Sequence, residues 1–99
     1  MKRGFIKCRV LWSEDVNGRA RVEIVESDGT KSTFIVSTDK ITKSGMLKVK
    51  VGDEREMEDN KNGSKEVRIR LPAIQNDSHV GYNVYVSPDE IRRTKEALK

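Results

Sequence analysis

His79, the only histidine of the 99-residue chain, directly follows Asp77 and Ser78, so the three residue types of a hydrolytic triad are adjacent. The side chains of such a triad normally converge from different elements, and the sequence has no Gly-x-Ser-x-Gly turn to expose a nucleophilic serine. We therefore expect no enzymatic activity. In the segment 72–82, which we predict to be a long loop, His79 and Tyr82 are instead candidates for contact with a partner protein.

Cys8 is the only cysteine, which excludes an internal disulfide, and one cysteine with one histidine cannot form a zinc cluster. Between Lys7 and Arg9 it is typical of a small core residue, although basic neighbours would favour a reactive thiolate. The acidic segment 53–61 lacks the Asp-x-Asp-x-Asp-Gly order of calcium loops. We predict no metal and no cofactor, and interpret 53–64 as a solvated hairpin extension.

Basic side chains alternate with apolar ones along the predicted strands, so they occupy the outer face. The chain holds 20 Lys+Arg against 16 Asp+Glu, a formal net charge of +4. A basic strand face can follow the phosphate backbone of a nucleic acid, with an aromatic side chain stacking on a base. Such bases also protect strand edges and pair with acids across strands. The candidate nucleic-acid-binding residues are Lys7, Arg9, Arg19, Arg21, Lys48, Lys50, Arg68, Arg70 and Tyr85.

Three runs in the first 37 residues alternate between apolar and polar side chains, as half-buried strands do. Asn17-Gly18, a pair typical of type I′ turns, separates the first run from the second, and a second Gly-containing pair follows at 28–29. These signals predict a three-stranded meander from the runs 6–12, 20–24 and 33–36.

The second half of the chain repeats this order of strands and turns. Residues 34–41 match residues 84–91 at an offset of 50 (91 − 41) as apolar, apolar, Val, Ser, x, Asp, x, Ile. We interpret 5–44 and 46–95 as an internal duplication, because either copy alone would bury too small a core. The alternative is that all-β chains rich in Asn-Gly turns resemble themselves by chance.

The repeated motif also carries a helix start. In the second copy Ser87 is a suitable N-cap, Pro88 has the φ of a first helical position, and Glu90 completes a capping box. This predicts an α-helix from Pro88 to Leu98. In the first copy the residues 42–45 end the pattern at once, so we expect one helical turn at most.

Together these patterns predict a single domain, 1–99, that is mainly β: a small six-stranded barrel or barrel-like sandwich of two tandem β-β-β-turn halves with a C-terminal α-helix. The order and length are similar to those of small barrels of the SH3-like, OB-like and cradle-loop classes, which share no common chemistry. The predicted core is Ile6, Val10, Trp12, Val22, Ile24, Val36, Ile41, Leu47, Val49, Val51, Val67, Ile69, Leu71, Val84, Val86 and Ile91.

The favoured function is that of a non-enzymatic binding module, a nucleic-acid-binding accessory protein that uses its basic strand face. The alternative is a protein–protein interaction or inhibitor module acting through a strand edge or the loops at 53–64 and 72–82. No apolar run reaches the ~20 residues that span a bilayer, and the N-terminal residues lack a signal-peptide pattern. We expect a cytoplasmic protein without membrane contact, whose oligomeric state the sequence leaves open.

Overall fold

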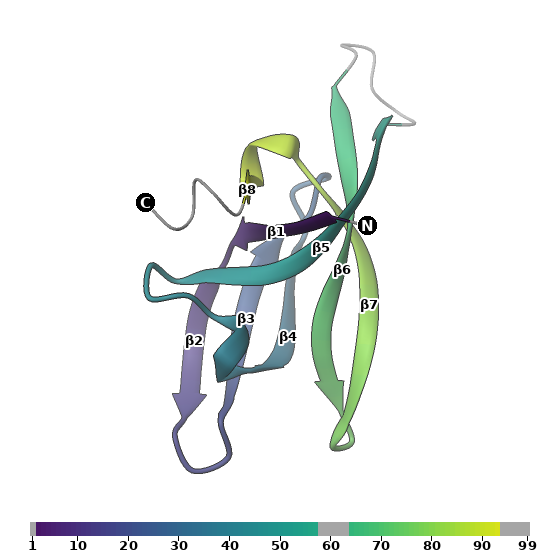
Figure 1. Ribbon diagram of the computed structural model, residues 1–99. Helices are drawn as coiled ribbons and strands as arrows, with labels where there is room; N and C mark the ends of the chain where they lie inside the picture. The colour runs from purple at the N-terminus through teal and green to yellow at the C-terminus, as the bar shows by residue number, and fades with distance from the viewer. Residues whose placement is uncertain (1, 58–63, 94–99) are drawn as a thin grey trace.

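The computed structural model describes residues 2–57 and 64–93, which form one eight-stranded antiparallel sheet curled into a half-barrel (Figure 1). The strand order is β2-β3-β4-β6-β5-β1-β8, and β7 pairs with β6 outside this path. The predicted mainly β class is confirmed. The strands are β1 (Lys2–Lys7), β2 (Arg9–Glu14), β3 (Arg19–Val25), β4 (Lys31–Ser37), β5 (Met46–Glu56), β6 (Lys65–Gln75), β7 (Ser78–Val86) and β8 (Ile91–Arg93).

Strand β6 connects the two parts of the sheet. One of its edges pairs with β7 along nearly its whole length, from Val67 to Gln75. The other edge pairs first with β5, as far as Arg70, and then with β4 at Ala73. Pro72 lies between these two partners, where a missing backbone N–H costs little. The sheet therefore splits at this point, with β5 and β1 on one side and β4 and β3 on the other (Figure 1).

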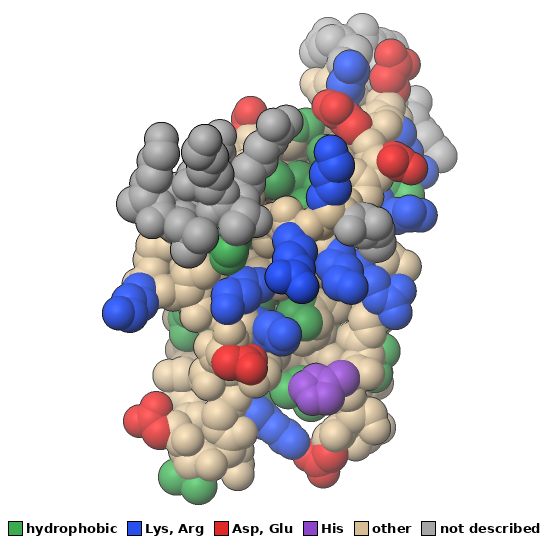
Figure 2. All heavy atoms as spheres, viewed as in Figure 1, with side chains coloured by type: hydrophobic (Ala, Val, Ile, Leu, Met, Phe, Trp, Pro, Cys, Tyr) green, Lys and Arg blue, Asp and Glu red, His purple; other side chains and the backbone are tan. Residues whose placement is uncertain are grey.

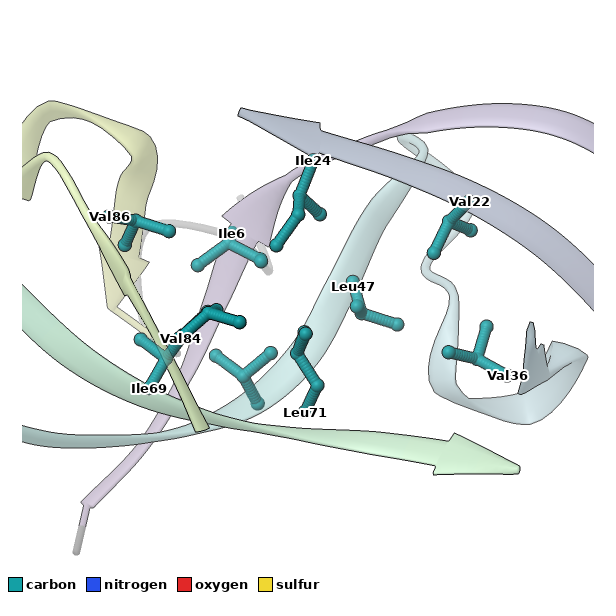
Figure 3. Close-up of a cluster of buried hydrophobic side chains, with 10 residues drawn as sticks. Ile6, Val22, Ile24, Val36, Leu47, Ile69, Leu71, Val84 and Val86 are labelled. Carbon is teal, nitrogen blue, oxygen red and sulfur yellow. The ribbon is translucent and has the colours of Figure 1, made fainter. Parts of the chain in front are cut away.

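The core fills the concave side of the curled sheet (Figure 3). Ten buried side chains from β1, β3, β4, β5, β6 and β7 form one cluster, and all ten were predicted from the period-two pattern. Ile41, Val51 and Ile91 pack against the cluster while partly buried. The ten are Ile6, Val22, Ile24, Val36, Leu47, Val49, Ile69, Leu71, Val84 and Val86.

Two predicted core residues, Val10 and Trp12, are instead exposed at 41% and 40%. The run 6–12 is not one strand, because it is interrupted at Cys8: β1 pairs with β5 and β8, whereas β2 pairs with β3 at the edge of the sheet. An extra residue at Leu11 then shifts the alternation, so Trp12 lies opposite Arg21 rather than opposite a core residue. The prediction was wrong because a periodicity shows neither a sheet edge nor a bulge.

The predicted loop at 72–82 is also wrong, because β6 and β7 continue into it and form a long hairpin. Its two-residue turn is Asn76-Asp77, with φ of 51° and 63°, the left-handed values that a type I′ turn requires. Asn and Asp tolerate this conformation without glycine. At Asn17-Gly18 the predicted hairpin forms, but Gly18 is the residue of that pair with positive φ, so the connection is not of type I′.

The predicted C-terminal α-helix is absent from the described part of its range. Pro88–Glu90 form a single 3-10 turn, and Ile91–Arg93 form β8. The amide of Ile91 closes the turn onto the carbonyl oxygen of Pro88, and Ile91 then pairs with Ile6 on the free edge of β1. Strand pairing with β1 outweighs the local helix signals here. Residues 94–98 of the predicted helix lie outside the described residues.

The two copies of the repeated motif adopt the same local conformation. Thr38–Lys40, like Pro88–Glu90, is one 3-10 turn flanked by extended residues, Ser37 and Ile41. The expectation of one turn at most in the first copy is confirmed. In both copies the isoleucine after the turn comes before or begins a strand that pairs with β1. Ile41 precedes β5, and Ile91 is the first residue of β8. The duplication itself stays a prediction.

The buried carboxylate of Glu66 on β6 forms a hydrogen bond with the turn that connects β3 and β4. Glu66 is 6% exposed and accepts hydrogen bonds from Ser27 Oγ (2.5 Å) and Arg55 Nε (2.8 Å). The hydrogen bond from Ser27, followed by the hydrogen bond and charge of Arg55, holds the pKa of Glu66 below its ordinary value, against the effect of burial. Ionised Glu66 therefore stabilises the fold at neutral pH.

We expect Glu66→Gln to lower the free energy of unfolding at pH 7 by about 1–3 kcal/mol, because it weakens charge-assisted hydrogen bonds. A group whose folded-state pKa is lowered contributes stability above its unfolded pKa, about 4.3, and loses it as the pH falls through the folded pKa. The difference between the two proteins should therefore shrink as the pH falls below the unfolded pKa. Urea unfolding at pH 7 and at a pH below the unfolded pKa measures it, and a pH-independent difference would contradict the assignment.

Candidate nucleic-acid interface

A groove of about 590 Å³ opens on the outer face of the sheet, where β5 separates from β6. β5 pairs with β6 only up to Lys50 and Arg70, and β6 then turns to β4 at Ala73. The gap between the diverging strands is thus a consequence of the topology. Its lining residues are Arg3, Gly4, Phe5, Lys40, Lys48, Val49, Lys50, Arg70, Leu71, Pro72 and Gly81.

Three bases of this groove lie in direct cross-strand register. Arg3 on β1 opposes Lys50 on β5, and Lys50 opposes Arg70 on β6. Like charges directly opposite each other destabilise a sheet, whereas alternating signs would stabilise it. A row of three positive charges therefore costs stability in the free protein, and an anion bound across the row would offset that cost.

No carboxylate neutralises this row within the described residues. Five bases line the groove (Arg3, Lys40, Lys48, Lys50 and Arg70), no acidic residue does, and none of the five forms an ion pair in residues 2–57 and 64–93. Figure 2 shows Lys and Arg side chains gathered across the middle of the face that carries β1 and β5. The groove is a site of concentrated positive potential.

Gly81 determines where the guanidinium of Arg70 lies. It lies on β7 opposite Pro72, two residue pairs beyond Arg70 and Asn83. A Cβ added to Gly81 would overlap Nε, Cζ and one terminal nitrogen of Arg70. The absence of a side chain thus lets the Arg70 guanidinium lie against the β7 backbone at the wall of the groove.

We expect Gly81→Ala to weaken anion binding about 3- to 10-fold while changing the free energy of unfolding by less than about 1 kcal/mol, because the flexible end of Arg70 moves and the backbone does not. Binding and urea unfolding measure the two quantities. In an Arg70→Ala background the same substitution should have no further effect on binding. An equal loss in both backgrounds would show that Gly81 does not act through Arg70.

Only some of the predicted basic residues come together at the groove. Lys48, Lys50 and Arg70 line it, and Arg68 lies on the same face of β6, two residues from Arg70. Lys7 is exposed at the end of β1 and does not line the groove.

Three of the predicted bases lie on β2 and β3 and do not line the groove. Arg9 opposes Glu23 across the two strands. Arg19 forms an ion pair with Asp77, and Arg21 donates a hydrogen bond to Thr33 Oγ1 (3.2 Å). The basic face predicted from the sequence is therefore concentrated on β1, β5 and β6 rather than spread over all strands.

Neither tyrosine of the predicted sites, Tyr85 for nucleic acid or Tyr82 for a partner protein, lines the groove. The guanidinium of Arg55 stacks on the Tyr85 ring at 3.7 Å, so one face of that ring is covered. Tyr82 opposes buried Leu71, which places it on the concave side of the sheet, where its ring packs on Phe34 at 5.4 Å between centroids. A base stacked on either tyrosine would not lie over the groove.

His79, Asp77 and Cys8 have different surroundings in the structure. His79 lines a smaller hollow beside the groove together with Asp39, while Asp77 is paired with Arg19. No cluster of three His, Cys, Asp or Glu side chains in the described part of the chain could hold a metal ion. The Cys8 thiol donates to the Gly45 carbonyl oxygen (3.2 Å), and burial raises its pKa, which favours the protonated form.

Three residues of the groove were missed by sequence reasoning. Arg3 belongs to β1, which begins earlier than the predicted strand, and Lys40 lies in the 3-10 turn that follows β4. The alternating position of Arg3 on β1 was an available signal. Nothing in the sequence indicated that Gly81 would face Arg70, because their contact depends on the β6–β7 register.

The chain matches no known protein-family model, no curated protein and no solved structure. Among the described residues no helix has the length and apolar character needed to cross a bilayer.

Proposed function

We propose that this protein is a non-enzymatic binding module that holds the phosphate backbone of a nucleic acid in the groove between β5 and β6. The observation that carries the proposal is the row Arg3–Lys50–Arg70, three like charges in direct register in a groove that no acid of residues 2–57 and 64–93 lines. Lysine and arginine side chains that contact phosphates release condensed counterions, which supplies most of the free energy of non-specific binding.

The spacing of the row suits a chain of anions rather than a single one. The three side chains belong to three adjacent strands, β1, β5 and β6, and neighbouring strands lie about 4.8 Å apart. The row is therefore long enough to contact more than one phosphate. Two further bases line the same groove: Lys48, two residues from Lys50 on β5, and Lys40 in the 3-10 turn that follows β4. Arginine contributes planar, bidentate contacts to phosphate oxygens, and lysine contributes point charges.

The described residues of the groove offer little surface for stacking on a base. Phe5 is the one aromatic among them and is 6% exposed, and both tyrosines of the chain lie elsewhere. Phosphate contacts position a protein on a nucleic acid but carry no sequence information. We therefore expect weak base discrimination and a strong dependence on salt.

Fluorescence anisotropy with labelled single-stranded and duplex DNA and RNA at about 50 and 200 mM salt tests the proposal. We expect dissociation constants of about 1–100 µM, the non-specific range, rising steeply at the higher salt. Absence of binding at about 100 µM protein and low salt, or binding insensitive to salt, would overturn it.

A second candidate function is protein interaction through an exposed strand edge. The predicted partner loop 72–82 is part of the β6–β7 hairpin, and most of the other loop, 53–64, lies in β5 or outside the described residues. The observation that favours this function is β2, an edge strand whose six residues are all exposed.

A further inference from the structure

We propose that the β2 edge binds β2 of a second copy of this chain, as antiparallel strands related by a two-fold axis. The inference rests on the second candidate function and is independent of the groove, so either can fail alone. Within the described residues β2 pairs only with β3. Val10, Leu11 and Trp12 are consecutive and exposed at 41%, 40% and 40%, an unusual apolar run on an open edge.

The β2–β3 register defines the face on which each β2 side chain lies, because directly opposed residues in an antiparallel pair share a face. Val10 and Ser13 oppose buried residues and therefore belong to the core-facing side. Arg9, Trp12 and Glu14 oppose partly exposed residues and belong to the outer side. The pairs are Arg9–Glu23, Val10–Val22, Trp12–Arg21, Ser13–Ala20 and Glu14–Arg19.

The sequence of β2, Arg-Val-Leu-Trp-Ser-Glu, complements itself when reversed. A two-fold axis between Leu11 and Trp12 sets Arg9 opposite Glu14 of the second copy, Val10 opposite Ser13, and Leu11 opposite Trp12. Two-fold symmetry makes each of these pairs occur twice. The paired edge would thus contain two opposite-charge pairs around four apolar side chains.

The bulge at Leu11 makes this register possible. A two-fold axis perpendicular to the sheet leaves the outer face of one copy next to the outer face of the other. In a regular strand Arg9 and Glu14, five residues apart, would lie on opposite faces, so this register would pair an outward side chain with an inward one. The extra residue shifts the alternation by one. Arg9 and Glu14 consequently share the outer face, and Val10 and Ser13 share the inner face.

We favour a second copy over an unrelated peptide because the strand complements itself: Arg9 and Glu14 pair in both directions. Binding of an unrelated peptide would not require this symmetry. Strand addition supplies backbone hydrogen bonds, and the apolar centre supplies buried area. Six paired residues alone bury less than the 1,200 Å² or so of a standard interface, so we expect a weak dimer with a dissociation constant of about 1–100 µM.

Sedimentation velocity of the wild-type chain from about 1 µM to 1 mM gives the first test, with the emission of Trp12, the only tryptophan, as a second readout. We expect dimers at the upper concentrations and a blue shift of Trp12 emission as it becomes buried. A monomer at about 1 mM with unshifted emission would overturn the proposal.

Charge reversal tests the register. Arg9→Glu alone and Glu14→Arg alone set like charges opposite each other across the axis, and each should weaken the dimer at least about 10-fold. An equimolar mixture of the two variants restores both opposite-charge pairs and should dimerise as the wild type does. Folding of each variant is checked by circular dichroism, and the double variant R9E/E14R is the second route to restored pairing. Dimers unaffected by reversal, or no recovery in either the mixture or the double variant, would contradict this register.

Binding of nucleic acid separates this inference from the proposed function. Neither Arg9 nor Glu14 lines the groove, so both variants should retain salt-sensitive binding per chain. If the variants lose the dimer but still bind nucleic acid, both proposals are supported. If the wild type dimerises but does not bind nucleic acid, only the proposed function of the groove is overturned.

Discussion

Lys50→Glu is expected to weaken nucleic-acid binding about 10- to 100-fold and, at the same time, to stabilise the fold by about 0.5–1 kcal/mol. Lys50 lies between Arg3 and Arg70 in cross-strand register. A carboxylate at this position would form a favourable pair on each side and neutralise the charges that contact phosphate. Binding weakens while stability rises because the three like charges repel one another in the free protein, and the substitution removes that repulsion.

Lys31→Glu is the matched control, because Lys31 is exposed, lies at the start of β4 and does not line the groove. Both variants change the formal net charge from +4 to +2, since each replaces one base by one acid. Anisotropy titration and urea unfolding measure the two effects. If Lys31→Glu weakened binding as much as Lys50→Glu, net charge and not the groove would explain the affinity.

Leu47→Ala is expected to lower the free energy of unfolding by about 3 kcal/mol, within the range of 2–5 kcal/mol for leucine truncation in a core. Leu47 is fully buried, lies opposite Ile6 on β1 and forms an isolated backbone β-bridge with Ile41. Truncation of its side chain therefore leaves a cavity where β5 packs against β1. In a domain of this size that loss lowers the Tm by roughly 12–24 °C.

Val16→Ala is the control for this prediction, because Val16 is 96% exposed in the β2–β3 connection and should change stability by less than about 0.5 kcal/mol. Thermal unfolding followed by circular dichroism compares the three proteins. A decrease of less than about 1 kcal/mol for Leu47→Ala would contradict the description of one closely packed core.

The core was predictable because it depends on local alternation. Ile6, Val22, Leu47 and Ile69 each lie at an apolar position of a period-two run, and burial of that face follows wherever the strand pairs on both edges. Trp12 has the same local pattern but is exposed, because β2 is an edge strand and its bulge shifts the alternation. Neither property is visible in local sequence.

The errors near the C-terminus have a different cause. Ser87, Pro88 and Glu90 are good helix-start residues, yet the chain needs only one turn before Ile91 reaches the edge of β1. Likewise Asn76-Asp77 makes a two-residue turn that a search for glycine does not detect. In both cases long-range pairing decided between two locally acceptable conformations.

The groove was half predictable. Alternation placed Lys48, Lys50 and Arg70 on the outer face, but their convergence with Arg3 depends on the pairing of β5 with both β1 and β6. Among the described residues these three bases form no ion pair, in contrast to Arg19 on β3. This difference also depends on topology, because the β6–β7 turn places Asp77 beside Arg19.

The salt dependence of binding by the wild type and by a Lys50→Ala/Arg70→Ala variant tests the central claim most directly. Each phosphate contact contributes a slope of about −0.7 for single strands or −0.9 for duplex in a plot of log K against log salt. If both side chains contact phosphates, the slope should become less steep by about 1.4–1.8 units. An unchanged slope in a folded variant would show that the groove does not contact phosphate, and would contradict the proposed function.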